Sequence, residues 1–253
     1  MNTPETLLKR LHEIGRSLSL RPTARALIGL GSVGIERERL DAFSDLDFFT
    51  IVAPGHKTEY LDSLDWLSDV SPIAYAFLNT PDGYKVMYED GIFCEFAVFE
   101  PHELHDVVYT PGVIVWKADG VSDEIRVPRK PPPPHSRPTI EWSLGEALTN
   151  LYVGLCRENR GESLSAMRFI QWYAVDRVVE LAEGLGQINP EQADPFNRER
   201  RIESRAPKLA YLLPDFAPGY HRNKAAARKI LAYLDEHFEI NKVMKAEILR
   251  LAA

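Results

Sequence analysis

The sequence predicts an α+β protein in which a mixed half of strands and helices is followed by an all-α half. Three observations predict this class. Short apolar runs separated by turn residues dominate residues 1–127, apolar residues at helical spacing dominate residues 139–253, and a proline-rich linker at 128–138 separates them. A chain of 253 residues is long enough to form two such domains.

The first half is expected to alternate between helices and strands. Apolar residues at positions 7, 11, 14 and 18 recur at helical spacing and predict a helix over 4–18. Apolar runs bounded by turn residues predict strands, and Asp82-Gly83 between two such runs is a hairpin signal. The elements expected after the first helix are strands 26–30 and 46–53, a helix over 60–66, and strands 72–78, 84–88, 92–99 and 112–117.

The linker and the second half have different patterns. The linker contains four consecutive prolines at 131–134, which favour an extended spacer because proline cannot donate a backbone hydrogen bond. Ser163 is expected to be the N-cap of a helix that Gly184 terminates. The helices expected in this half are 143–156, 163–183, 224–238 and 241–251.

Residues 187–219 interrupt the helical pattern. This segment is rich in proline and polar residues, so we expect a mobile loop. It carries a basic run that is expected to be solvated, formed by Arg198, Arg200, Arg201 and Arg205.

Composition argues against several classes of protein. The net charge is -7, and residues 1–127 contain 21 acidic against 11 basic residues. This balance disfavours binding to long nucleic acids, since phosphate contacts require lysine and arginine. Two cysteines cannot form a disulfide framework, and no run approaches the ~20 apolar residues of a membrane span. We therefore expect a cytoplasmic protein with no membrane association.

Two short motifs in the first half carry the expected chemistry. Gly31-Ser32 ends a strand; glycine lets the backbone approach a phosphate closely, and a serine hydroxyl can bind its oxygens. Asp45 and Asp47 open the next strand, point to the same face and have Cα atoms roughly 6.6 Å apart. Such a pair suits Mg²⁺, because Mg²⁺ usually takes one or two carboxylates plus substrate phosphates. The two carboxylates are also well placed to bridge two Mg²⁺ ions.

Glu95 is a third candidate, because it lies inside the apolar run 92–99 and an acid is costly to bury alone. If its strand lies beside that of Asp45 and Asp47, the three acids converge. Glu95 would then bind metal or accept a proton from an attacking hydroxyl. Each motif by itself also fits an ordinary turn or a solvent-facing strand, whereas the combination in this order predicts a catalytic site.

With these motifs the chain resembles the nucleotidyltransferase superfamily of the DNA polymerase β type. Within it, the sequence is similar to antibiotic nucleotidyltransferases, of the lincosamide type and more loosely of the aminoglycoside type. The residues that carry the resemblance are Gly31-Ser32, the run Ser44-Asp45-Leu46-Asp47-Phe48 and the run 91–99. A weaker likeness lies at 160–164, where a helix of the second half begins.

The resemblance implies an architecture and an activity. It implies a nucleotidyltransferase catalytic domain over 1–127 and a helical substrate-binding or dimerisation domain over 139–253, in proteins that are often homodimers. The implied reaction transfers a nucleoside monophosphate from an NTP, with ATP expected, to a hydroxyl of a small acceptor. In the antibiotic enzymes this reaction confers drug resistance.

The resemblance also implies a role for each motif. Gly31 and Ser32 would hold the triphosphate, and Asp45 and Asp47 would bind two Mg²⁺ ions. Glu95 would be the general base or a third metal ligand. Two alternatives stay open, namely AMP transfer to a protein and a nucleotide-binding module without catalysis; retention of all three acids argues against the second.

Other charged and aromatic residues receive weaker expectations. Arg37 and Arg39 follow the Gly-Ser motif and are expected to be solvated rather than to contact phosphate. Arginines of the second half that could bind the triphosphate are Arg157, Arg160, Arg168 and Arg177. The aromatic residues near them are expected to belong to the core, and these are Tyr152, Phe169, Trp172 and Tyr173.

Overall fold

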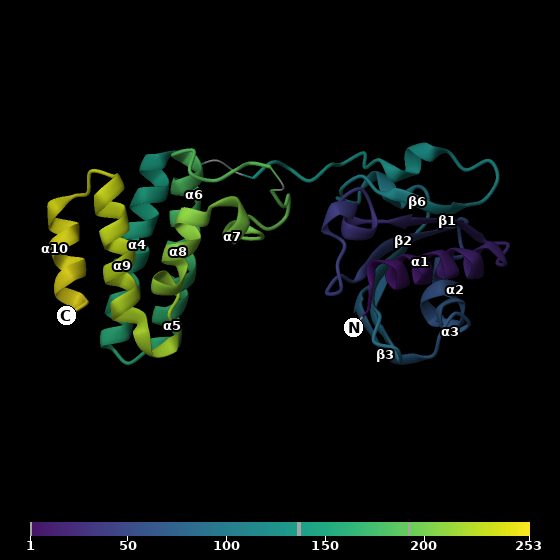
Figure 1. Ribbon diagram of the computed structural model, residues 1–253, viewed down its shortest axis with the longest axis horizontal. Coiled ribbons are helices and arrows are strands. Elements are labelled where there is room, and N and C mark those ends of the chain that lie inside the picture. Colours follow the sequence, from purple (N-terminus) through teal and green to yellow (C-terminus); the bar gives the residue numbers. More distant parts are fainter. Residues whose placement is uncertain (1, 136–137, 192) are drawn as a thin grey trace. The chain divides into compact units, whose positions relative to one another are not determined.

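The structure, a computed structural model, describes residues 2–135, 138–191 and 193–253. Residues 136 and 137 of the expected linker therefore lie outside the described part of the chain. The chain forms two compact units, Met1–Pro132 and Pro133–Ala253, called here the sheet unit and the helical unit (Figure 1). Each unit has its own hydrophobic core.

The sheet unit begins with helix α1, which Thr3 caps by accepting the Thr6 N–H. The helix predicted over 60–66 is instead two short helices, because Ser63 is extended between them. The helices are α1 (Pro4–Ser19), α2 (Lys57–Asp62) and α3 (Asp65–Ser68), and the strands are β1 (Ala24–Gly29), β2 (Leu46–Val52), β3 (Ile73–Thr80), β4 (Gly83–Tyr88), β5 (Phe93–Phe99) and β6 (Val113–Lys117).

These strands form one mixed six-stranded sheet in the order β3-β4-β5-β2-β1-β6. Strands β2 and β5 are parallel neighbours, whereas the other neighbouring pairs are antiparallel. The predicted hairpin joins β3 to β4 through Pro81 and Asp82. A mixed sheet followed by a helical region confirms the predicted α+β class.

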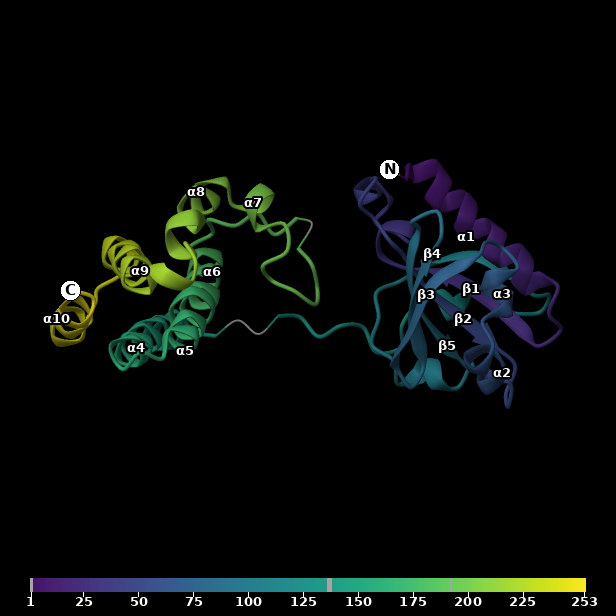
Figure 2. The same cartoon turned by 90° about the horizontal axis from the view of Figure 1, so that it is seen from below.

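All three helices pack on one face of the sheet. Helix α1 lies on β1 and β6 and contacts α3, while α2 contacts β5 (Figure 2). Leu7 and Leu11 of α1 and Trp66 of α3 are buried there with Phe48 and Phe96 of the central strands. Since side chains alternate along a strand, the neighbours of Phe48 and Phe96, including Asp47 and Glu95, point to the opposite face.

That opposite face is covered over only part of its area. A second, smaller core there contains Ile28, Ile51, Phe99 and Leu104, so β1, β2 and the end of β5 are packed. On the edge strand β3, the middle residues of the strand are exposed. The face that carries Asp47 and Glu95 therefore passes from a packed half to an open half.

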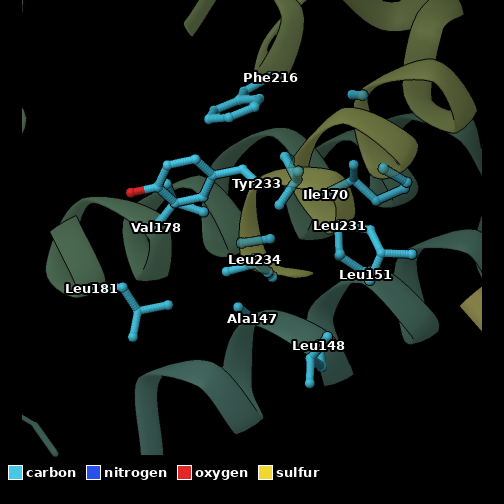
Figure 3. Packing of buried hydrophobic residues seen from close by; sticks show 14 of the residues in the cluster. Ala147, Leu148, Leu151, Ile170, Val178, Leu181, Phe216, Leu231, Tyr233 and Leu234 are labelled. Carbon is cyan, nitrogen blue, oxygen red and sulfur yellow. The ribbon is translucent and has the colours of Figure 1, made fainter. Parts of the chain in front are cut away.

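The helical unit is a bundle whose core includes buried residues of α4 (Ile140–Asn159) and α9 (Asn223–His237), which Figure 3 shows packed together. A Cβ at Gly154 would lie 2.5 Å from Ile170 Cγ1, so α4 approaches the segment after α5 closely because it has a glycine there. The helices are α4 (Ile140–Asn159), α5 (Ser163–Met167), a π-helical segment (Arg168–Tyr173), α6 (Ala174–Gly184), α7 (Ile202–Arg205), α8 (Pro207–Phe216), α9 (Asn223–His237) and α10 (Lys242–Leu251). No helix in the described part of the chain is both long and apolar enough to cross a membrane.

Two expectations about helix ends have different outcomes. The N-cap of α5 is Glu162 and Ser163 is the first helical residue, so the predicted cap was wrong by one position. Gly184 ends α6 as predicted. The predicted loop over 187–219 was also wrong, because α7 and α8 lie within it and bury Ile202 and Phe216 in the core.

The basic run in that segment was expected to be solvated; this was wrong for Arg198, Arg201 and Arg205, which are paired and mostly buried, whereas Arg200 is exposed as expected. Arg205 is buried and donates to the carbonyl oxygen of Asn189 at 3.1 Å. Arg198 pairs with Glu180 of α6 at 2.6 Å. The remaining two arginines of the run, Arg200 and Arg201, both pair with Asp194.

Candidate active site

The Gly31-Ser32 turn follows β1 and lies against the start of β2. The Leu30 N–H donates to the carbonyl oxygen of Asp47 at 2.8 Å, which ties the two strand ends together. Gly31 has a φ of +51°, and a Cβ at this position would lie 3.7 Å from Asp47 Oδ2. Ser32 is almost buried in the turn. The turn and the Asp47 carboxylate therefore form one continuous surface.

Two further glycines, to which the sequence analysis gave no role, shape this turn. A Cβ at Gly29 would lie 2.7 Å from the carbonyl oxygen of Val33. A Cβ at Gly34 would lie 2.8 Å from the carbonyl oxygen of Gly29. Real Cβ atoms do not approach oxygen so closely, so the turn requires glycine at both positions. The close spacing of Gly29, Gly31 and Gly34 was the available signal in the sequence.

The parallel pairing of β2 with β5 brings the predicted acids together. Asp47 and Glu95 are Cα partners at the same register. Residues at one register on neighbouring strands share a face, with the strands about 4.8 Å apart. Asp45 lies two residues before Asp47, immediately before β2, and is half-buried. All three predicted acids thus lie at one end of two adjacent strands.

Side chains from β3 and β4 contact Glu95 on the flank of β5 that is opposite to β2 and Asp47. Asn79 of β3 donates its amide to Glu95 Oε1 at 3.1 Å. Lys85 of β4, the Cα partner of Glu95, places Nζ 3.2 Å from Oε2. Both carboxylate oxygens therefore contact side chains from β3 and β4. Sequence analysis missed Lys85 and Asn79, because their contact depends on strand pairing rather than on local pattern.

The buried thiol of Cys94 lies within electrostatic range of both Asp45 and Asp47. Burial raises the pKa of the Cys94 thiol, and Arg10 opposes this increase. The negative charges of Asp45 and Asp47 raise this pKa further, as expected for two carboxylates near the same thiol. Cys94 is thus a neutral, buried core residue.

Asp45 and Asp47 fit a Mg²⁺ site in which two carboxylates bind the ion and phosphates and water complete its coordination shell. Asp47 supplies hard oxygen atoms beside the glycine turn, and Asp45 is the second carboxylate, two residues earlier in the sequence. Within residues 2–135, 138–191 and 193–253, no three His, Cys, Asp or Glu side chains are grouped to hold one ion. Glu95 as a third metal ligand stays a prediction.

Arg39 lies nearer to the turn than expected. A Cβ at Gly31 would lie 3.9 Å from Arg39 Nη2, and Arg39 pairs with Glu36. Its side chain is mostly buried, so the expectation of a solvated residue was wrong for Arg39. Arg37 is exposed, as expected. One cation therefore lies beside the turn that is predicted to hold phosphate.

The candidate residues of the helical unit lie on its surface rather than in its core. Arg157 stacks on Phe169 at 4.2 Å, and Arg177 stacks on Trp142 at 5.2 Å while pairing with Glu180. Arg160 and Arg168 are exposed. The expectation of core aromatics was wrong for three residues that are exposed, Tyr152, Trp172 and Tyr173.

Comparisons with known proteins give limited information about this chain. No protein-family model matches it, and no curated protein matches it. Among solved structures, it is similar to an aminoglycoside 6-adenyltransferase from Bacillus subtilis, with a TM-score of 0.36 and 11% identity over 99% of this chain and 92% of the other. At this TM-score the similarity carries no argument about function.

Proposed function

We propose that the chain is a nucleotidyltransferase that moves a nucleoside monophosphate from an NTP to a hydroxyl of a small acceptor. The observation that carries the proposal is the juxtaposition of the Gly31 turn, the Asp47 carboxylate and Glu95 at one end of β1, β2 and β5. These residues belong to the sequence motifs that resemble nucleotidyltransferases.

The proposed reaction assigns one task to each group. The Gly31-Ser32 turn holds phosphate oxygens, with Arg39 as a nearby cation. The acceptor hydroxyl oxygen forms a bond to the α-phosphorus as the bond to pyrophosphate breaks, and its electron pair leaves with pyrophosphate. Glu95 accepts the hydroxyl proton. Positioning and charge compensation supply most of the catalysis in reactions of this type.

Asp45 and Asp47 are the residues that would hold Mg²⁺ in this proposal. The metal, when bound, neutralises the negative charge of the phosphates. Asp45 and Asp47 fix its place relative to the turn, because Asp47 Oδ2 lies beside Gly31. The role of Glu95 is different, since its contacts with Lys85 and Asn79 orient it toward the open half of the sheet.

The first test is a pyrophosphate-release screen with Mg²⁺ and each NTP against antibiotics, sugars and candidate proteins.

Asp45→Asn and Asp47→Asn should each lower turnover by roughly 10³-fold, because each removes a carboxylate that would hold the Mg²⁺ that compensates the phosphates. Glu95→Gln should lower turnover while leaving NTP affinity unchanged. Asp119→Asn, at an exposed turn of the same unit, is the matched control and should turn over normally.

The outcomes separate the alternatives. Full activity of both Asp45→Asn and Asp47→Asn, in variants that keep the circular dichroism of the wild type, would exclude the site. Release of pyrophosphate only with a protein acceptor would favour AMP transfer to a protein. Binding of Mg·ATP without release against any acceptor would favour a nucleotide-binding module.

A further inference from the structure

A row of side chains crosses the sheet at the register of the candidate site. Asp47 of β2 is the Cα partner of Glu95, Glu95 is the partner of Lys85, and Lys85 is the partner of Phe77 on the edge strand. Partners at one register share a face of the sheet. The order along this face is therefore the Gly31 turn, Asp47, Glu95, Lys85 and Phe77.

The end of this row is open and apolar. Phe77 is 52% exposed, and Tyr75, two residues earlier on the same face, is 58% exposed. Met87 of β4 is the partner of Tyr75 and is only partly buried. Two aromatic rings therefore lie in the open about two strand spacings, roughly 10 Å, from Glu95.

This end of the row also lacks negative charge. Strands Ile73–Thr80 and Gly83–Tyr88 contain no acidic residue, and Lys85 is their only charged residue. Lys85 is neutralised by Glu95. A ligand lying here meets aromatic rings and a paired lysine, with no carboxylate on either strand to bind an ammonium group.

The direction of the reaction decides which ligand lies at this end. In an in-line displacement the attacking oxygen enters opposite the leaving group. If the Gly31 turn holds the phosphates that leave, attack comes from the side of Glu95 that faces Lys85 and Phe77. The nucleoside stays bonded to the α-phosphorus and lies at an angle to the line between the attacking oxygen and the leaving pyrophosphate. The acceptor therefore lies along the row formed by Glu95, Lys85 and Phe77.

We propose that the exposed face of β3 and β4, formed by Tyr75, Phe77, Lys85 and Met87, binds the acceptor. It selects a hydroxylated compound with an aromatic or otherwise apolar body, rather than a polycationic amino sugar. This inference rests on the proposed nucleotidyl transfer and adds the acceptor class to it. The apolar body covers Tyr75 and Phe77 while its hydroxyl reaches Glu95.

The same strand provides a matched pair of variants. Phe77 and Leu78 are neighbours with similar exposure, 52% and 49%, but they point to opposite faces of β3. Phe77→Ala removes an aromatic ring from the proposed acceptor face. Leu78→Ala removes a similar apolar area from the other face. Because both side chains are about half exposed, both variants should fold.

The experiment measures ligand binding by saturation-transfer NMR, with Mg²⁺ and a non-hydrolysable ATP analogue present. The probes are phenyl β-D-galactopyranoside, methyl β-D-galactopyranoside and the amino sugar kanamycin. In both the wild type and Leu78→Ala, we expect the phenyl glycoside to bind more tightly than the methyl glycoside and kanamycin do. Phe77→Ala should weaken that binding by about tenfold, the loss expected when an aromatic contact worth about 1.4 kcal/mol is removed.

Several results would overturn the proposal. These are no binding of the phenyl glycoside to the wild type, tighter binding of kanamycin, or equal losses in Phe77→Ala and Leu78→Ala. A loss of ATP affinity in Phe77→Ala would assign the rings to the nucleobase instead. A change from dimer to monomer in Phe77→Ala by sedimentation, with unchanged probe binding, would make the face an interface between two copies of the chain.

Failure of the proposed nucleotidyl transfer would look different. Mg·ATP would then bind Asp47→Asn as tightly as the wild type in calorimetry, whatever the result with the glycosides. If instead Asp47→Asn weakens Mg·ATP binding and Phe77→Ala leaves glycoside binding unchanged, only the assignment of the acceptor face is wrong.

Discussion

The two units hold their carboxylates in different ways. In the helical unit, Asp194 is buried, accepts the N–H groups of Phe196 and Asn197 at 2.9 and 3.0 Å, and pairs with Arg200 at 2.8 Å. In the sheet unit, Glu95 is 42% exposed at the side chain and lies at the register of another acid, Asp47. Asp194 is thus enclosed by donors, whereas Glu95 is contacted by Lys85 and Asn79 and keeps an exposed part on the face that also carries Asp47.

This difference separates a structural acid from an acid that is available for chemistry. A buried carboxylate whose oxygens are filled by N–H groups and arginines stabilises the fold and cannot bind a further ligand. A carboxylate on a partly open face, contacted by one lysine and one amide, keeps an exposed part that a further ligand can reach. We therefore expect substitutions in the helical unit to affect stability, and those in the sheet unit to affect nucleotide binding and turnover.

The largest expected stability effect concerns Asp194. Replacing it by alanine leaves Arg200 and Arg201 without their partner and two N–H groups without an acceptor, so Asp194→Ala should lower the free energy of unfolding by about 3–5 kcal/mol. Urea denaturation followed by circular dichroism measures this loss.

A matched control for Asp194 lies in the same unit. Asp215 pairs with Lys229 at 2.9 Å, but both side chains are more than half exposed. Asp215→Ala should therefore cost less than about 1 kcal/mol, because water screens exposed ion pairs. Equal losses of stability in Asp194→Ala and Asp215→Ala would contradict the expectation that the buried carboxylate contributes more than the exposed ion pair.

A smaller effect is expected at the glycine turn of the sheet unit. Gly31→Ala introduces a side chain at a φ of +51° and should lower the free energy of unfolding by about 1–2 kcal/mol. Its Cβ would also lie beside Asp47 Oδ2, where the proposal places the nucleotide phosphates and the metal. ATP-dependent pyrophosphate release should consequently fall by about tenfold or more.

Gly55 supplies the control for this substitution. It has a φ of +83°, and a Cβ there would meet nothing within 4 Å. Gly55→Ala should therefore cost similar stability and leave turnover unchanged. If both variants lose turnover equally, the effect of Gly31→Ala comes from backbone strain alone and the turn has no special role.

The smallest effect is a pH dependence of the helical unit. Burial raises the pKa of Asp194, but hydrogen bonds from Phe196 and Asn197 and the charges of Arg200 and Arg201 outweigh it and hold this pKa below its usual value of 3.8. Stability due to ionised Asp194 is present above that usual value and is lost as the pH falls through the lowered pKa of the folded state. The wild type should thus lose stability below about pH 4 more steeply than Asp194→Asn in urea denaturation; parallel profiles would contradict this assignment.

Most of the fold could be predicted from local patterns. Apolar runs bounded by turn residues located β2 and β5, and the pair Asp82-Gly83 located the hairpin between β3 and β4. The pattern failed over 187–219, where polar residues outnumber apolar ones. Arg205 is buried there because it finds carbonyl oxygens on a folded loop, and no local periodicity reveals such partners.

The candidate site was predictable in part for the same reason. Period-two alternation placed Asp45 and Asp47 on one face, and the glycines marked the turn. Arg39 was expected to be solvated and Lys85 was missed, because each comes close to the site through the path of a turn or the pairing of distant strands. The assignment of Asp45, Asp47 and Glu95 as catalytic groups stays a prediction until turnover is measured.

The sequence by itself determined the class of the fold, the strand that carries two acids on one face and the turn that precedes it. These properties depend on neighbours within a few residues, so local periodicity and backbone preference decide them. Only the tertiary structure decided that β2 lies beside β5 with Asp47 at the register of Glu95, and that Lys85 and Phe77 continue the row. Strand order and register are long-range properties, because they depend on which apolar faces pack together across the whole sheet.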